Sequence, residues 1–359
     1  MKTLRRRCRQ LAQENAALRE EAERLSFAPP AVSSATGTAD TAPQAYAGRF
    51  PQLAAIDRAY ADRGEPRYTA FADLEALSVH MRCFSASRLG FYTEVHTFSI
   101  FLAALACGKT VYLRGGAPES AIAVPYAAAL ALGEELDCPG ADRAELTAAL
   151  YRAHWDAAPK FILLPPGTKP PADYSGSGIR LAAGAWPDDP RYLQGGCLAL
   201  PANVRYLSLE PQHKAIGFVA PPAQEAPFPA MFTAARPVRD KQLRQMFTEA
   251  AAWHPVPEGS ETTYRQIETL LANELMLSAA ERGWAQFEKF HGVCASCGMG
   301  DAAALDAFLY HHALRCLERT EPAARRWLLP QLLPILHESG CTATASWVDT
   351  LIHAGAPKK

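Results

Sequence analysis

Hydrophobic positions in the first 26 residues follow a seven-residue repeat. Leucines occupy every seventh position, while Cys8, Asn15 and Ala22 fill the alternate seam positions, with Arg and Glu on the flanks. This narrow apolar stripe predicts a coiled-coil helix over residues 1–26, and the polar Asn15 favours one register, often in a dimer. A single amphipathic helix folded back on its own body is the alternative. The predicted oligomerisation seam comprises Leu4, Leu11, Asn15, Leu18 and Leu25.

The next stretch, residues 27–50, consists mainly of Pro, Ala, Ser, Thr and Gly and carries almost no charge. It lacks the apolar surface that would offset the entropy of ordering, so we predict a flexible linker. Residues 51–92 then space their apolar positions as helices do, which predicts a helical N-terminal segment. Residues 97–107 predict a further helix, which ends at Gly108 in the usual position of a helix stop.

Strand and helix patterns alternate after this helix. Residues 109–114 predict a short strand, Gly115 and Gly116 a tight loop, and residues 121–132 an Ala-rich helix. A strand, a glycine loop and a helix in this order are typical of phosphate-binding α/β folds. The remaining predicted elements are strands at residues 161–164 and 204–209 and helices from about Lys241 onward.

These patterns predict an α/β fold in several parts. A coiled-coil helix and a linker precede the helical segment, an α/β core with a parallel sheet spans residues 93–240, and an all-helical domain spans residues 241–359. The length of 359 residues is sufficient for two or three domains.

Composition limits the possible partners. The chain has 36 Lys and Arg against 37 Asp and Glu, which argues against a whole-domain electrostatic grip on nucleic acid or anionic lipid. The basic cluster at residues 5–9 is too short for a DNA-reading helix.

Nine scattered cysteines do not resemble a secreted disulfide framework. The start of the chain does not read as a signal peptide, and the longest apolar stretch, residues 98–107, is too short to span a bilayer. We therefore expect a cytoplasmic protein with neither a membrane nor a nucleic acid as its partner.

Four segments resemble a known family in the correct order. Residues 105–127 are similar to the phosphate-loop region of AAA+ ATPases of the McrB-like and dynein-related group. Residues 185–196 and 200–206 resemble the stretch that leads to the sensor-1 strand of that family, and residues 297–309 resemble its helical lid. The resemblance covers roughly residues 68–352 and implies an AAA+-like P-loop core followed by a lid.

A working phosphate loop has the pattern Gly-x-x-x-x-Gly-Lys-Ser/Thr, which supplies amides and an ammonium for phosphates and a hydroxyl for magnesium. In the register of the resemblance, residues 115–122 hold these eight positions, and the first glycine survives as Gly115. Pro118 removes one backbone donor from the loop, and Glu119 adds a negative charge. The second glycine, the lysine and the hydroxyl residue are replaced, in that order, by Ser120, Ala121 and Ile122.

The other catalytic positions of the family are also altered. Pro165 and Pro166 stand where the magnesium ligand and the water-activating acid belong. The polar sensor-1 position falls near Pro211, and the arginine finger falls near Glu225, which inverts the charge. Arg282 matches the sensor-2 arginine of the lid and is the one active-type residue that the resemblance still places.

The resemblance therefore implies a pseudoenzyme, a non-hydrolysing scaffold or regulatory subunit that acts through oligomerisation and partner binding. No cofactor is required; ATP or GTP would bind without hydrolysis at a degenerate site of Gly115, Gly116, Ser120 and Arg282. The expected partners are further copies of the chain or an active AAA+ paralogue, joined in part through the coiled coil. A nucleotide-binding switch or weak ATPase with a remodelled loop stays open, as does a DNA-associated protein tethered by the N-terminal helix.

Three further features carry simpler interpretations. Cys294 and Cys297 form one pair and not a tetrahedral metal site, so they are predicted as core residues of a helix. His311 and His312 follow each other in a predicted helix, and we expect at least one to be exposed. The apolar, proline-broken residues 327–336 are predicted to pack within the helical domain, with an exposed partner groove as the alternative.

Overall fold

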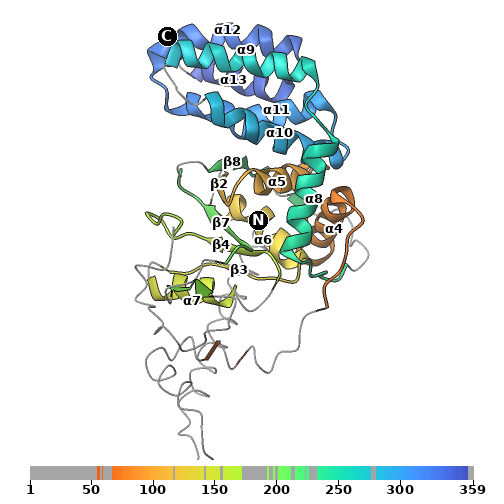
Figure 1. The fold of residues 1–359 in the computed structure, drawn as a ribbon. Coiled ribbons are helices and arrows are strands. Elements are labelled where there is room, and N and C mark those ends of the chain that lie inside the picture. The colour runs from red at the N-terminus through yellow and green to blue at the C-terminus, as the bar shows by residue number, and fades with distance from the viewer. Residues whose placement is uncertain are drawn as a thin grey trace, which may run out of the picture. The chain divides into compact units, whose positions relative to one another are not determined.

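The computed structural model describes most of the chain after residue 66 (Figure 1). The described ranges are 67–115, 118–140, 143–153, 157–171, 201–211, 215–222, 233–275 and 280–354, with short pieces at 55–56, 59, 192–193, 197–198 and 224–225. The predicted coiled coil with its leucine seam and the predicted linker lie outside these residues. Contacts group Tyr46–Lys359 into a single compact unit.

A five-stranded parallel sheet forms the centre of the α/β part (Figure 1). The first of these five strands in the sequence lies between the last two in the sheet, so strands that come later in the chain pair with it on both sides. This arrangement confirms the predicted α/β class with a parallel sheet, and three of the five strands coincide with predicted ones. In spatial order the strands are β3 (Leu136–Asp137), β4 (Lys160–Leu163), β7 (Val204–Ser208), β2 (Thr110–Arg114) and β8 (Ile216–Val219).

One face of this sheet carries the main core. Val111 and Leu113 alternate with less buried neighbours along β2 and point into helices α5 (Thr97–Cys107) and α6 (Pro118–Ala131). Phe101 of α5 lies against the rings of two strand residues, at 6.3 Å from Phe161 and 5.3 Å from Phe218. Helix α4 (Leu74–Phe84) packs on both α5 and α6. Its N-cap Asp73 accepts a hydrogen bond of 2.7 Å from the amide of Ala76, which fixes where the helix begins.

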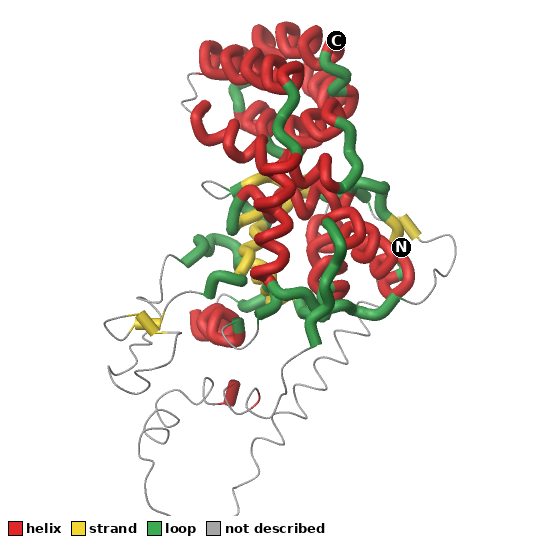
Figure 2. Tube along the Cα trace, turned by 45° about the vertical axis from the view of Figure 1, so that its right-hand side comes forward, coloured by secondary structure: helices red, strands yellow, loops and turns green. Residues whose placement is uncertain are grey.

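The chain is helical from Asp240 onward throughout its described residues, as predicted (Figure 2). Helix α10 (Ala280–Ser296) packs along α5 and α8 (Asp240–Trp253) and joins the helical part to the α/β part through one continuous apolar core. The buried carboxylate of Asp240 accepts a hydrogen bond of 2.9 Å from Arg205 of β7, which adds a charged link between the two parts. The helices are α8 (Asp240–Trp253), α9 (Glu258–Leu275), α10 (Ala280–Ser296), α11 (Asp301–His311), the 3-10 helix η2 (Ala313–Arg319), α12 (Pro322–Glu338) and α13 (Thr342–Ala354).

Several local details differ from the sequence predictions. Asp137 of β3 accepts a hydrogen bond of 2.6 Å from Arg152 at the end of helix α7 (Arg143–Arg152). Gly108 ends α5 as predicted but has an extended backbone, with φ of −176°, so it does not use the left-handed freedom of a glycine stop. Short elements complete the fold: the π-helical turn η1 (Ser85–Leu89), the antiparallel pair β1 (Phe91–Tyr92) and β9 (Gln224–Glu225), and the antiparallel pair β5 (Tyr192–Leu193) and β6 (Cys197–Leu198).

Candidate functional site

The carboxyl end of β2 is the place where this topology favours a ligand. From β2 the chain crosses to β3 at one edge of the sheet, whereas from β7 it crosses to β8 on the other side of β2. Parallel sheets bind ligands outside the carboxyl ends of their strands, where the connections diverge in this way. Gly115 directly follows β2, so the predicted glycine loop lies at this position.

The connection from β2 to α6 is too short for a wrapped phosphate loop. Helix α6 already begins at Pro118, so residues 118–122, the last five of the eight loop positions, are helical. Gly115 packs tightly on this helix, because a Cβ atom there would lie 3.0 Å from the amide nitrogen of Ala121 and 3.0 Å from Oγ of Ser120. The structure thus brings Gly115 and Ser120 together, whereas Gly116 lies outside the described residues.

The side chains of this first turn do not offer a cation to a phosphate. Ala121, at the position of the family's lysine, is 2% exposed and packs in the core. Ile122 is partly buried against the same core, and Glu119 in the first turn is exposed. A carboxylate near a helix N-terminus interacts favourably with the helix dipole and competes with any bound anion. Residues 118–122 include neither lysine nor arginine, so the described first turn of α6 has no cationic side chain.

The neighbouring strand ends carry proline and an internally bonded turn. Strand β4 ends at Leu163, so Pro165 and Pro166 follow it at the predicted place. After β7, Oγ of Ser208 donates to the carbonyl of Glu210 at 2.8 Å and accepts from its amide at 3.1 Å. The Glu210 carboxylate also accepts a hydrogen bond of 2.8 Å from the amide of Gly167. Glu210 is therefore an acid at this edge that the sequence analysis did not single out, and it ties two loops together.

Arg282 lies at the other end of the sheet. Helix α10 runs antiparallel to α5, because Sγ of Cys107, at the C-terminal end of α5, donates to the carbonyl of Gln286 at 3.2 Å. Cys107 lies three residues before Thr110, the first residue of β2, and Arg282 lies one helical turn before Gln286. The five residues of β2 place its two ends ~13 Å apart. The structure therefore does not bring Arg282 to Gly115; its side chain is not among those described.

Charged side chains missed by the sequence analysis meet beside the carboxyl end of β2. Arg114, the last residue of β2, forms an ion pair with Glu318 of η2. Glu318 also accepts a hydrogen bond of 2.7 Å from Arg315. The Arg315 guanidinium lies between two rings, 4.3 Å from Tyr310 and 4.4 Å from Trp347. Burial lowers the pKa of Arg315, and the nearby charge of Arg114 lowers this pKa further. This network joins the sheet to the helical part.

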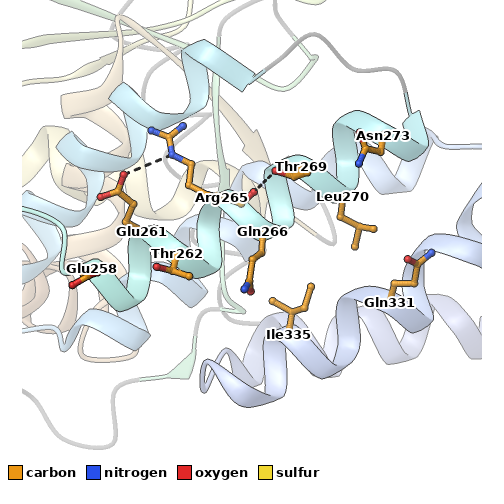
Figure 3. A pocket seen from close by; sticks show the side chains of 10 residues that line it. All are labelled: Glu258, Glu261, Thr262, Arg265, Gln266, Thr269, Leu270, Asn273, Gln331 and Ile335. Atoms are coloured by element: carbon orange, nitrogen blue, oxygen red, sulfur yellow. Dashed lines mark hydrogen bonds and ion pairs between the residues drawn. The ribbon is translucent and has the colours of Figure 1, made fainter.

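An open groove of about 780 Å³ runs between α9 and α12 (Figure 3). Its α9 wall is polar, and Arg265 there pairs with Glu261 at 3.8 Å. On α12 the groove is lined by Gln331 and Ile335. The α12 leucines at positions 328, 329, 332 and 336 are buried, as packing within the helical part predicts, whereas Trp327 is 76% exposed. The predicted alternative was an exposed surface for a partner. The groove and the exposed indole of Trp327 supply such a surface on this part of the helical domain.

The paired cysteines and histidines are buried or partly buried. Cys294 and Cys297 are buried at the end of α10, as predicted; burial raises the pKa of Cys297 to about 12. The expectation that His311 or His312 is exposed is wrong, because His311 is buried and His312 is partly buried. Within the described part of the chain, no three His, Cys, Asp or Glu residues form a group that could hold a metal ion. No described helix combines the length and apolar character needed to cross a membrane.

Comparison with known proteins identifies no relative. The chain matches no protein-family model, no curated protein and no solved structure. The class that its fold defines is an α/β protein with a five-stranded parallel sheet and a C-terminal helical part.

Proposed function

We propose that this chain is a non-hydrolysing, AAA+-like scaffold or regulatory subunit that acts by oligomerisation and partner binding. Two features support an AAA+-like core: the parallel sheet, and a glycine turn that leads from its inner strand β2 into α6. The helical part that follows the sheet corresponds to a lid. The coiled coil predicted for residues 1–26 adds an oligomerisation element.

The observation that carries the proposal is the early start of α6. A phosphate loop binds by wrapping backbone amides around phosphate oxygens, and a lysine and a magnesium ion neutralise the developing charge. Here residues 118–122 are helical and buried Ala121 replaces the lysine. Pro165 and Pro166 follow β4 and supply neither a carboxylate for magnesium nor a base for water. At the positions that the resemblance assigns, phosphoryl transfer by the usual route therefore lacks its lysine, its magnesium ligand and its base.

The test is nucleotide turnover by the purified full-length chain. We expect no magnesium-dependent hydrolysis of ATP or GTP above a buffer blank. Turnover that persists through purification and is abolished by Gly115→Asp would refute the proposal, because that substitution places a carboxylate where phosphate would lie. Glu338→Gln changes one charge at an exposed position on α12, outside the loop between β2 and α6. It is the control for effects on turnover that come only from a change in net charge.

Binding without turnover separates the scaffold from a nucleotide-dependent switch. Titration calorimetry with ATP and GTP, with and without magnesium, gives no heat of binding if the chain is a pure scaffold. Micromolar binding would instead identify a switch. Light scattering of the full chain and of a chain lacking residues 1–26 tests the oligomerisation part of the proposal. A monomeric full-length chain at micromolar concentration would leave the coiled coil without a role in self-association.

A further inference from the structure

The outer edge of the sheet is closed by side chains and not by another strand. β8 is an edge strand that pairs only with β2 in the five-stranded sheet. The amide of Ala220 donates inward to the carbonyl of Arg114 at 2.8 Å, so the amides of Gly217 and Val219 point outward by alternation. Unpaired amides on such an edge attract strands from other chains. In this structure both outward amides have acceptors.

Two consecutive histidines of the helical part supply these acceptors. The Val219 amide donates to Nδ1 of His311 at 2.9 Å, and the Gly217 amide donates to Nδ1 of His312 at 3.1 Å. The ring of His311 also stacks on Phe218, with centroids 5.6 Å apart and planes at 14°. We call His311 and His312, with the β8 amides that they accept, the edge seal.

The edge seal requires both rings to be neutral. A ring nitrogen that accepts a hydrogen bond cannot carry a proton, so the proton of each neutral ring lies on Nε2. Nε2 of His312 lies 3.2 Å from Oε1 of Gln286, to which it donates. A second proton on Nδ1 would turn the acceptor into a donor that faces another donor. Proton uptake is therefore incompatible with the seal.

Close backbone packing makes the seal all-or-none. A Cβ atom on Gly217 would lie 2.2 Å from the carbonyl oxygen of His311, so glycine is needed where α11 ends against β8. A ring that loses its hydrogen bond cannot simply rotate outward while the backbone stays in place, because His311 is buried and stacked. Loss of the hydrogen bonds thus separates the end of α11 from the strand.

We propose that the edge seal is a proton-operated latch: protonation of His311 and His312 releases the end of α11 from β8 and exposes a sheet edge. The released edge leaves the amides of Gly217 and Val219 without their ring acceptors. This proposal concerns a different surface from the carboxyl edge of the sheet and does not depend on nucleotide binding.

The electrostatic surroundings favour the neutral, sealed state. Burial lowers the pKa of His311 to about 3, with a further lowering by the charge of Arg315, and burial lowers the pKa of His312 to about 4. Besides Arg315, the charged groups near this end of α11 are the ion-paired Arg114 and Glu318. The remaining neighbours are uncharged: the ring of Tyr310 beside His311, Gln286 of α10, and the apolar side chains of β8.

The expected response follows from proton linkage. In the released state each ring regains an ordinary pKa of 6.5. At pH 5.0 protonation then favours release by ~30-fold for each histidine and by ~1,000-fold for the two together. Between pH 6 and pH 5 the release equilibrium changes by ~8-fold per histidine.

Residue-resolved amide hydrogen exchange of the full chain tests the proposal. Protection factors, corrected for intrinsic exchange, are measured from pH 7.5 to pH 5.0 for four successive residues of the strand. We expect Gly217 and Val219 to lose protection by roughly 100-fold or more, while Phe218 and Ala220, whose amides point toward β2, keep theirs. Equal loss at all four amides, or no loss at Gly217 and Val219, would overturn the proposal.

Three variants make the test independent of general acid effects. In the double variant His311→Asn and His312→Asn, Oδ1 takes the place of the accepting Nδ1 but does not titrate, so the pH dependence should disappear. His337→Asn, at an exposed position on α12, should leave it unchanged. Gly217→Ala should open the seal already at pH 7.5. Full protection of Val219 in that variant, or unchanged pH dependence in the double asparagine variant, would also overturn the proposal.

Discussion

The contact between α8 and α10 gives a sharp prediction for one methyl group. Gly292 is buried in the middle of α10, and a Cβ atom there would lie 2.6 Å from Cα of Ala251 and 2.8 Å from the carbonyl oxygen of Ala250. Ordinary Cβ contacts begin near 3.4 Å, so in Gly292→Ala helix α8 must retreat by about 0.8 Å. The neighbouring atoms are backbone, which cannot rotate away. The substitution therefore strains the interface on which the helical part rests.

Two opposing terms set the magnitude. Overpacking of this kind costs about 1–3 kcal/mol. Alanine is better than glycine inside a helix by ~1 kcal/mol, which offsets part of this cost. We expect a net loss of about 0–2 kcal/mol in the free energy of unfolding, centred near 1 kcal/mol. With an m value of roughly 3 kcal/mol/M, the urea midpoint should fall by ~0.3 M.

A matched glycine separates the two terms. Gly259 lies exposed in the first turn of α9, and a Cβ atom there would meet nothing within 4 Å. Gly259→Ala therefore gains helix propensity without a clash and should raise the midpoint or leave it unchanged. Urea unfolding monitored by circular dichroism compares the two variants with the parent. If Gly292→Ala is as stable as Gly259→Ala, the close approach of α8 to α10 is not as described.

Three further predictions test other parts of the structure. Below pH 6.5 the free energy of unfolding should fall, and at pH 5 His311 and His312 should each account for a loss of ~2 kcal/mol, because their folded pKa values lie below the unfolded value. Urea titrations at several pH values measure this loss, and a flat profile would contradict it. Phe101→Ala should cost about 3–5 kcal/mol, since the ring is fully buried between Phe161 and Phe218, and a loss below 1 kcal/mol in thermal or urea unfolding would argue against that packing. Iodoacetamide at pH 8 should label exposed Cys83 quickly and buried Cys294 and Cys297 only on unfolding, as peptide mass spectrometry would show; early labelling of the α10 pair would place it at the surface.

Much of the fold is predictable from the alternation of apolar residues. The strands at residues 110–114, 160–163 and 204–208 were predicted to within one residue at either end, because each is a short apolar run bounded by turn residues. β8 was not predicted. It has only four residues, and Gly217 in its interior weakens the strand signal. That glycine is required by the approach of His311, a contact that becomes visible only in three dimensions.

The candidate site was predictable in composition but not in shape. The absence of lysine and of acids at the positions of Ala121, Pro165 and Pro166 is evident in the sequence. The sequence analysis began the helix at Ala121, whereas α6 begins at Pro118, a residue suited to a first helical turn. Nor could the sequence show that Arg282 lies beyond the amino end of β2, since the direction of α10 depends on its packing against α5 and α8.

The position of β2 inside the sheet has a consequence for how the chain is made. Its partners β7 and β8 lie far downstream, and Val111 pairs with Leu207, 96 residues later. At a synthesis rate of about 5–20 residues per second, this strand waits for roughly 5–20 s before either neighbour leaves the ribosome. During that time both of its edges and the apolar side chains of Val111 and Leu113 have no partner strand. The core of the sheet therefore forms only after residues 204–219, which include both partner strands of β2, have been translated.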